Sequence, residues 1–471
     1  MLVKHAAAYV FARGIPGLIS FATIALYTRL LTPYEYGQYA VVVAASTLMN
    51  VLLFWWLRAA MLRKLHSPNG RLAVNVALGV FTLIAAAVLL LSLFSSPVWL
   101  RSPFAGLIAL GLLLFLVQAF FELSLELARA KLDPASYGRL MVSRALLSLA
   151  IGTGLIFAGF SVRGPLLGLV SGMAIPVLLW GGRIWRGVSV SLDRQLVGSF
   201  LQYGIPLGWT FALSYVIAFS DRFILTGYRG AESTGIYAAA YDLAFNGINL
   251  VSWIVGLAGT PLVMRALDNL GSDAARRQLI YNSRLLSAAI IPSAVALILF
   301  APSVVEVLLG NRFHTGAPLV LVLSAASAVL HGIRNQHFDL AFQLSQKTRV
   351  QALAMSLAAA SNIVLNFILI PSYGAAGAAW ATVAAYAVAL ALSYTLGNRI
   401  WSVPFDLVAA AGSLFFALVA YAISGWLLNA YSLGIPPLAQ LLLNLSLGSL
   451  VYLGLWLVTL RSSAYKWLGL R

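Results

Sequence analysis

The sequence is poor in charged residues and contains no cysteine. Only 9% of its 471 residues are Asp, Glu, Lys or Arg, whereas soluble domains carry about 25%. The absence of cysteine excludes disulfides and thiolate metal sites. The phosphate-loop pattern G-x-x-x-x-G-K-[ST] is also absent, which argues against ATP hydrolysis by this chain. Because 61% of the residues are hydrophobic, most of the chain is unsuited to contact with water.

Acidic residues are especially few: there are 13, against 30 Lys and Arg, and the formal net charge is +17. Such a charge can indicate nucleic-acid binding, but here the basic residues lie in short segments between apolar runs, not on one soluble face. The runs recur from end to end and are about 20 residues long, enough to cross roughly 30 Å of hydrocarbon as helices. The sequence predicts an all-α integral membrane protein with no nucleic-acid partner.

Fourteen apolar runs are candidate transmembrane helices, and Pro or Gly punctuates many of the short stretches between them. They lie at about 6–31, 36–60, 72–95, 103–124, 137–160, 164–184, 200–226, 233–262, 280–301, 317–342, 349–370, 374–397, 405–428 and 437–460. One lysine precedes the first run, and no A-x-A-like cleavage site follows it in the expected place. We interpret this run as a retained span rather than a cleaved signal peptide.

Lys and Arg are unequally divided between the two sides that fourteen spans define. With the N-terminus inside, 21 lie in cytoplasmic segments and adjoining helix ends, four lie outside and five lie within spans. The four outside are Arg101, Arg163, Arg229 and Arg312. Because Lys and Arg are retained on the cytoplasmic side, we expect both termini in the cytoplasm.

An internal repeat relates the first spans to the seventh and eighth. The matching stretches are Gly-Ile-Pro at 14–16 and 204–206, Gly-x-Tyr-Ala at 37–40 and 235–238, and Trp55 with Trp253. Chance is the alternative, since Gly and Ala are common here. Six spans per half enter from the same side, which predicts a parallel pseudo-repeat of two six-helix lobes. The predicted domains are residues 1–195, residues 196–400 and an additional helix pair at 401–471.

Five arginines within or near the ends of spans are candidate anion-binding residues, because a charge in hydrocarbon usually faces a wet cavity or a partner. They are Arg13, Arg58, Arg144, Arg222 and Arg334. For Arg13 and Arg144 the alternative is snorkelling to the interface. For Arg58 it is anchoring at the cytoplasmic end of its span. For Arg334 it is exposure where a polar stretch, residues 331–339, emerges into water.

Two aspartates are candidates for binding a coupling proton or sodium ion. Asp221 and Asp242 lie at similar depth in the seventh and eighth predicted spans. The alternative for Asp221 is mutual neutralisation with Arg222 between packed helices. No metal site or other cofactor is expected.

Amides and an aromatic ring suit the hydroxyls and apolar faces of sugars, and they equally suit bonding between neighbouring helices. Asn246, Asn249 and Trp253 follow Asp242 on one helix face, and Asn50 lies in the second span. These four residues are weak candidates for binding sugar.

Three stretches resemble the polysaccharide transport family of the multidrug, oligosaccharidyl-lipid and polysaccharide exporter superfamily, which includes Wzx-type flippases. They are Arg-Leu-Leu-Thr-Pro-Tyr-Glu-Tyr-Gly-Gln-Tyr at 29–39, Ser-Asp-Arg at 220–222 and Tyr-Gly-Ala-Ala-Gly-Ala-Ala-Trp-Ala-Thr at 373–382. The resemblance covers nearly the whole chain. It implies a MATE-like flippase fold, two lobes around a central cavity and alternating access.

The resemblance also implies a substrate, a polyprenyl diphosphate carrying a short sugar chain, and a place in a bacterial inner (plasma) membrane. In related lipid II flippases, arginines on the first helices hold the diphosphate, and Arg13 and Arg58 match them in helix and approximate depth. Arginine suits this task because it gives bidentate donors that are always charged. We expect a monomer that works with a polysaccharide polymerase or other assembly proteins.

Other functions are weighed against this one. A MATE-type exporter of cationic drugs needs cavity carboxylates, and the buried basic residues here outnumber isolated acidic ones. A membrane glycosyltransferase or polymerase needs a catalytic acid or a large outside loop, and neither is visible in the sequence. A scaffold for envelope assembly stays open, as do the sugar and the driving force.

Overall fold

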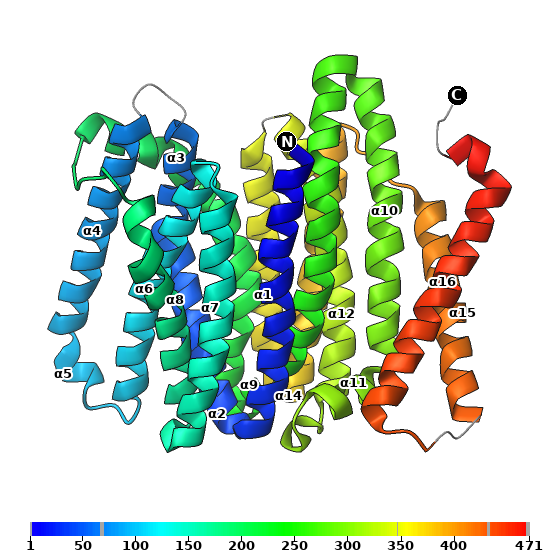
Figure 1. The fold of residues 1–471 in the computed structure, drawn as a ribbon, viewed down its shortest axis with the longest axis horizontal. Coiled ribbons are helices and arrows are strands. Elements are labelled where there is room, and N and C mark those ends of the chain that lie inside the picture. The colour runs from blue at the N-terminus through cyan, green and yellow to red at the C-terminus, as the bar shows by residue number, and fades with distance from the viewer. Residues whose placement is uncertain (1, 66–69, 346, 431–433, 468–471) are drawn as a thin grey trace. The chain divides into compact units, whose positions relative to one another are not determined.

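A computed structural model describes residues 2–65, 70–345, 347–430 and 434–467, and they form helices joined by short turns (Figure 1). The side chains of residues 2–13, 206, 207, 210, 348, 429 and 459–467 are not part of this description. The helices are α1 (Leu2–Leu30), α2 (Pro33–Asn50), α3 (Trp56–Leu65), α4 (Gly70–Phe94), α5 (Ser96–Trp99), α6 (Ala105–Ala130), α7 (Pro134–Leu155), α8 (Arg163–Ile184), α9 (Arg194–Leu270), α10 (Ser272–Leu299), α11 (Ala301–Leu308), α12 (Ala317–Ile333), α13 (Leu340–Leu344), α14 (Thr348–Ile400), α15 (Leu407–Ala430) and α16 (Pro437–Trp467).

The number of membrane crossings agrees with the sequence. Among the described residues, 11 helical stretches are long and apolar enough to cross a membrane. Two of them, α9 and α14, are interrupted by glycines with positive φ, Gly230 at 81° and Gly374 at 55°. Only glycine adopts such angles without strain, so each of these stretches supplies two crossings. With the apolar helix of α1, the described part of the chain contains the fourteen expected spans.

By internal contacts the chain divides into two units, the first comprising residues 1–238 and 348–374 and the second residues 239–347 and 375–471. In the first unit, α7 packs against α1 and α8, while α6 packs against α2 and α8. In the second unit, α10 packs against α12 and α15, and α15 packs against α16 (Figure 1). The division into domains at 195 and 400 stays a prediction.

Small residues allow the close approach of α7 and α8. A Cβ atom on Gly168 would lie 2.6 Å from Cα of Gly152, and one on Gly172 would lie 2.0 Å from Oγ of Ser148. The Tyr27 hydroxyl of α1 donates to the Ser148 carbonyl at 3.2 Å. Because lipid offers no hydrophobic drive for helix association, such close packing supplies much of the stabilisation.

The start of α2 explains the first family-like motif in physical terms. Thr32 and Glu35 form a capping box: the Glu35 N–H donates to the Thr32 hydroxyl at 3.2 Å, and the Thr32 N–H donates to the Glu35 carboxylate at 2.8 Å. Pro33 occupies the first helical position, where its missing N–H has no cost. The motif therefore fixes where the second span begins.

Two glycines that the repeat makes equivalent contact each other within the first unit. A Cβ atom on Gly37 would lie 1.8 Å from the Ala231 carbonyl oxygen, and one on Gly235 would lie 1.9 Å from the Pro33 carbonyl oxygen. Residues 33 and 37 correspond to 231 and 235 at one constant offset, so the contacts are reciprocal. Reciprocal contacts of this kind are those of a two-fold axis, which supports the repeat over chance.

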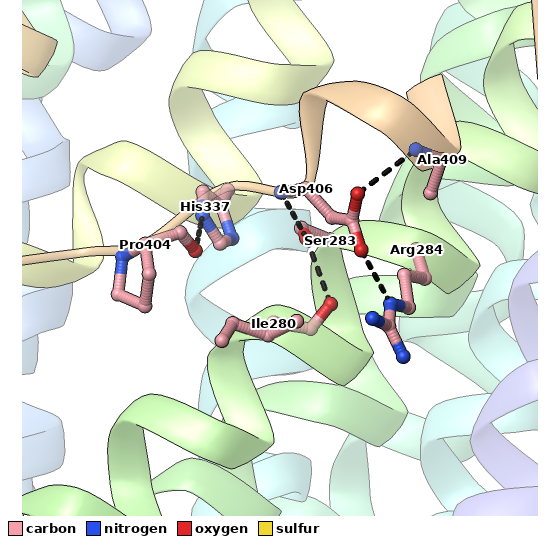
Figure 2. Close-up of polar contacts among 7 residues, drawn as sticks. All are labelled: Ile280, Ser283, Arg284, His337, Pro404, Asp406 and Ala409. Atoms are coloured by element: carbon pink, nitrogen blue, oxygen red, sulfur yellow. Dashed lines mark hydrogen bonds and ion pairs between the residues drawn. The ribbon is translucent and has the colours of Figure 1, made fainter. Parts of the chain in front are cut away.

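The C-terminal helix pair is joined to the rest of the second unit through the start of α15. Figure 2 shows the Asp406 carboxylate accepting from the Ala409 N–H at 2.9 Å and from Nε of Arg284 at 2.6 Å. The Asp406 N–H donates to the Ser283 hydroxyl at 3.1 Å, and His337 contacts the Pro404 carbonyl at 3.1 Å. The segment entering α15 is thus bonded to α10 and to the turn after α12.

The Gly37 and Gly235 contact predicts a large effect from one methyl group. Gly37→Ala or Gly235→Ala forces the two helices apart, and overpacking of this kind costs about 1–3 kcal/mol. Thermal unfolding of the purified protein in detergent should show a lower midpoint for both variants. Gly227→Ala is the matched control, because a Cβ there meets nothing within 4 Å. Equal midpoints for all three variants contradict the contact.

The Asp406 network predicts acid sensitivity. Burial opposes ionisation of this carboxyl, but the Ala409 N–H and the Arg284 guanidinium outweigh burial and lower the pKa of Asp406. Its stabilisation is therefore present above the pKa of the unfolded chain and is lost as pH falls through the lower folded value. Asp406→Asn keeps a capping acceptor and loses the ion pair, whereas Asp406→Ala loses both at a further cost of about 1 kcal/mol. At pH 7 the thermal midpoints should rank wild type, Asn and Ala in that order, and at pH 3 the advantage of wild type over Asn should shrink while the gap between Asn and Ala remains. A constant difference between wild type and Asn contradicts the interpretation.

Candidate functional site

A polar seam runs between α2, α3 and α6 inside the first unit. The Ser46 hydroxyl donates to the Gly111 carbonyl at 3.0 Å, and the Phe54 ring lies 5.7 Å from the Phe115 ring. Asn50 lies about one helical turn from Ser46 and one from Phe54, so its side chain lies on the same face, toward α6. It is fully buried, and neither of its side-chain polar atoms has a hydrogen-bond partner among the described residues. An unsatisfied buried amide is costly, which marks this depth of the seam as a place for a further polar partner.

A π-helical turn at Val51–Trp55 sets the direction of the residues that follow. Such turns add a residue to a helix and recur at functional sites. After the turn, Arg58 points to α6, as Phe54 does, and its guanidinium forms an ion pair with Glu122. The Trp55 ring stacks on Phe211 with 4.0 Å between centroids, which places the outer side of this turn against α9.

The Arg58 and Glu122 ion pair is the centre of the seam. The Arg58 side chain is 8% exposed and that of Glu122 is 27% exposed. Glu122 also accepts from Nε2 of Gln118 at 3.0 Å, and one turn further Glu126 pairs with Arg129 at 2.7 Å. Arg58 is therefore a buried, paired cation and not a simple anchor in the interface or an uncompensated guanidinium.

Sequence reasoning missed the two carboxylates of the seam. Gln118, Glu122 and Glu126 follow one another at intervals of four, which places them on one helix face. That spacing could have identified them. The predicted fourth span ended at 124, so it contained Glu122 near its end and left out Glu126, whereas α6 extends to Ala130.

Asp221 and Arg222 lie in a second buried cluster of the first unit. The Asp221 carboxylate accepts from the Tyr237 hydroxyl and, at 2.7 Å, from the Arg222 N–H. The Arg222 guanidinium lies 5.0 Å from the Phe219 ring centroid. The Ser220 hydroxyl donates to Asn362 at 3.1 Å, so polar contacts continue onto α14. Cation binding at Asp221 stays a prediction.

Arg334 belongs to the core of the second unit. It begins a π-helical turn at Arg334–Phe338 and forms an ion pair with Asp339 at 3.7 Å, and both side chains are 2% exposed. The Ser393 hydroxyl donates to Asp339 at 2.7 Å. The interpretation that this stretch emerges into water is therefore wrong for Arg334: the π-turn keeps the guanidinium inside the bundle, beside its counter-ion.

The second half of α9 has one packed face and one polar face. Tyr241 and Phe245 are buried, and Phe245 lies 5.3 Å from the His331 ring and 5.8 Å from the Tyr386 ring. The predicted sugar-binding and ion-binding residues lie on another face of the helix. Asn246 is exposed there, and Asp242, Asn249 and Trp253 are half-buried. The polar face is therefore less buried than the face that carries Tyr241 and Phe245.

Two predicted arginines remain, Arg13 and Arg144. The Arg13 side chain lies outside the described residues. Arg144 is half-buried on α7, with its guanidinium 5.6 Å from the Phe121 ring centroid. The structure thus places Arg58, Arg144 and Arg222 in the first unit and Arg334 in the second, each with its own surroundings.

The first unit also contains an apolar cavity of about 740 Å³. Tyr34, Met49, Trp99 and Phe104 are among its lining residues, and of the predicted anion-binding arginines whose side chains are described, none lines it. Among the residues that the structure describes, no group of three or more His, Asp or Glu side chains is arranged to hold a metal ion.

The repeated helices that are long and apolar enough to cross a membrane identify a multi-pass membrane protein, and its fold is that of the exporter superfamily expected from the sequence. The lipid II flippase MurJ in an inward closed conformation superposes with a TM-score of 0.79 at 15% identity, over 98% of this chain and 99% of that chain. An inward-facing multidrug resistance MATE family transporter gives a TM-score of 0.64 at 14% identity, over 83% and 97% of the two chains. The predicted fold class is confirmed.

The chain belongs to the polysaccharide biosynthesis protein family, whose family model matches residues 26–318. A relative from Haloferax volcanii, described as the probable low-salt glycan biosynthesis flippase Agl15, is 22% identical over 98% of this chain and 97% of that protein. The family predicted from the sequence is confirmed.

The Asp221 cluster predicts a coupled stability effect. Tyr237→Phe and Asp221→Asn each weaken the same buried hydrogen bond, at a cost of about 1–3 kcal/mol. Their double variant should lose little more than either single variant, as thermal midpoints of the purified protein would show. Asp268→Asn, at an exposed position, is the control and should change the midpoint least. Additive losses from Tyr237→Phe and Asp221→Asn contradict the pairing.

Proposed function

We propose that this protein flips a polyprenyl-diphosphate-linked oligosaccharide from the cytoplasmic to the outer leaflet of a cell membrane by alternating access, for export of polysaccharide. Membership of the polysaccharide biosynthesis family supports this function. So does full-length similarity to a relative described as a glycan biosynthesis flippase and to the fold of a lipid II flippase. The protein acts as a transporter and carries out no covalent chemistry of its own.

The observation that carries the proposal is the buried guanidinium of Arg58 within a membrane-spanning stretch. Charged groups at such depth are retained where substrate or a partner needs them. A diphosphate is a compact anion, and arginine binds phosphate oxygens bidentately through its planar fork. Arg58 is therefore the primary diphosphate-binding residue, and Arg13, Arg144, Arg222 and Arg334 are secondary candidates.

The polar face of α9 suits the sugar part of the cargo. Its amides and the Trp253 ring lie on the less buried face of the helix. Asp221 and Asp242 are the candidate sites for a coupling proton or sodium ion. The excess of Lys and Arg in predicted cytoplasmic segments supports a cytoplasmic location for both termini. In a bacterium the membrane would be the inner membrane.

A second candidate function is export of organic cations, as the shared fold of a multidrug transporter suggests. The carboxylates Glu122 and Glu126 are the observation that favours it. Each is already paired with an arginine, Arg58 or Arg129, so the seam offers no net negative charge to a cation. The anionic cargo is the better supported of the two because the family model and the full-length relative both concern polysaccharide or glycan biosynthesis.

Flipping by reconstituted protein tests the proposed function. In proteoliposomes with a fluorescent lipid-linked oligosaccharide, Arg58→Ala should slow transport at least ~10-fold, the loss expected when about 1.4 kcal/mol of phosphate binding is removed. Arg13→Ala should also abolish transport if its side chain reaches the cargo. Arg312→Ala, at an exposed position, is the control and should transport at the wild-type rate.

Wild-type protein that flips no lipid-linked oligosaccharide contradicts the proposed function. Flipping that survives Arg58→Ala in a folded protein leaves the cargo in place and removes Arg58 from its binding site.

A further inference from the structure

Arg58 already has an anionic partner, and this constrains how a phosphate can reach it. Nη1 of Arg58 contacts the Glu122 carboxylate, and the Glu122 carboxylate also accepts from Gln118. Two cations and two anions lie along this part of the seam: Arg58, Arg129, Glu122 and Glu126. Their formal charges cancel. A phosphate that approached Arg58 with Glu122 in place would meet a like charge at the same guanidinium.

The two members of the pair differ in freedom. Arg58 is nearly enclosed, whereas the Glu122 side chain retains about a quarter of its accessible surface. A glutamate has fewer torsions fixed by packing when it is partly exposed, so moving its carboxylate aside disturbs less than moving the guanidinium. The ion pair therefore opens from the Glu122 side. A buried charge left without its partner is strongly destabilising. An incoming anion avoids this cost, because it takes the place of the carboxylate beside Arg58.

The equivalent place in the second half of the repeat carries no ion pair. The offset that relates Gly37 to Gly235 relates Arg58 to Gly256, in the second half of α9. A Cβ atom on Gly256 would lie 2.0 Å from Oε1 of Gln336, in the π-helical turn after α12. The second unit thus joins these two helices by close uncharged packing. A charged pair is not required to hold helices together at this position, so the pair of the first unit calls for a functional reason.

We propose that Glu122 is a built-in counter-ion of Arg58 that only a strongly anionic headgroup displaces, so that the pair selects diphosphate-linked lipid over ordinary membrane phospholipid. This inference rests on the proposed function, in which Arg58 binds the diphosphate. A phosphodiester headgroup such as that of phosphatidylglycerol brings one negative charge, no more than the carboxylate it would replace. A diphosphate brings at least two and offers more acceptor oxygens to the guanidinium fork. Selection against the abundant phospholipid then comes from competition within the protein.

Binding of two lipids to matched variants tests this selection. Radiolabelled undecaprenyl diphosphate is titrated onto purified protein in nanodiscs of neutral lipid, with phosphatidylglycerol as competitor. Glu122→Gln keeps the size of the side chain and removes its charge. It should bind undecaprenyl diphosphate about tenfold more tightly, a gain equal to ~1.4 kcal/mol, and phosphatidylglycerol should now compete. Glu126→Gln, one turn away with Arg129 as its own partner, should change the affinity for either lipid less than Glu122→Gln does.

Loss of the counter-ion can also lower stability, so thermal unfolding is measured with and without undecaprenyl diphosphate. Glu122→Gln should unfold at a lower temperature than wild type alone and show a larger upward shift when the diphosphate lipid is added. Glu122→Asp retains the charge one methylene further from Arg58 and should give intermediate selectivity.

The outcomes separate this inference from the proposed function. If Arg58→Gln loses diphosphate binding while Glu122→Gln binds both lipids as the wild type does, the counter-ion inference is wrong and the cargo site stands. If Arg58→Gln binds undecaprenyl diphosphate as tightly as wild type, the assignment of Arg58 to the cargo is itself wrong.

Discussion

The arrangement of this protein depends on the cost of placing a guanidinium in a region without water. Desolvating one charge costs several kcal/mol, and a nearby opposite charge or aromatic face must offset most of it. Each buried arginine with a described side chain has such company: a carboxylate beside Arg58 and Arg334, and an aromatic ring beside Arg222. The positions of these arginines are set by the packing of the helices, which small residues allow to approach closely. A cation held in this way is a suitable receptor for an anion only if its existing partner can leave.

The repeat shows how the two halves of the chain have diverged around one scaffold. Equivalent glycines, Gly37 and Gly235, meet reciprocally, and a methyl group on either would collide with main chain. Further along the same helices the equivalence ends, because Arg58 corresponds to Gly256. The two halves share the close helix crossing at Gly37 and Gly235, and they differ in the charged residue that follows it.

The sequence was sufficient to predict the fold, because run length and charge bias act on each span separately. Helices of about 20 apolar residues and the glycine breaks at Gly230 and Gly374 agree with the expected fourteen spans. The site was harder to predict because partners are set by packing between distant segments. No local pattern pairs Arg58 with Glu122, and the π-helical turns before Arg58 and at Arg334 change the direction of side chains in a way that regular periodicity does not anticipate.

The central claim is that a phosphate replaces Glu122 at Arg58, and an experimental structure with undecaprenyl diphosphate bound tests it most directly. Our account predicts phosphate oxygens within hydrogen-bonding distance of the Arg58 guanidinium, with the Glu122 carboxylate turned away from it. A bound diphosphate held elsewhere, with the Arg58 and Glu122 pair intact, would contradict the account.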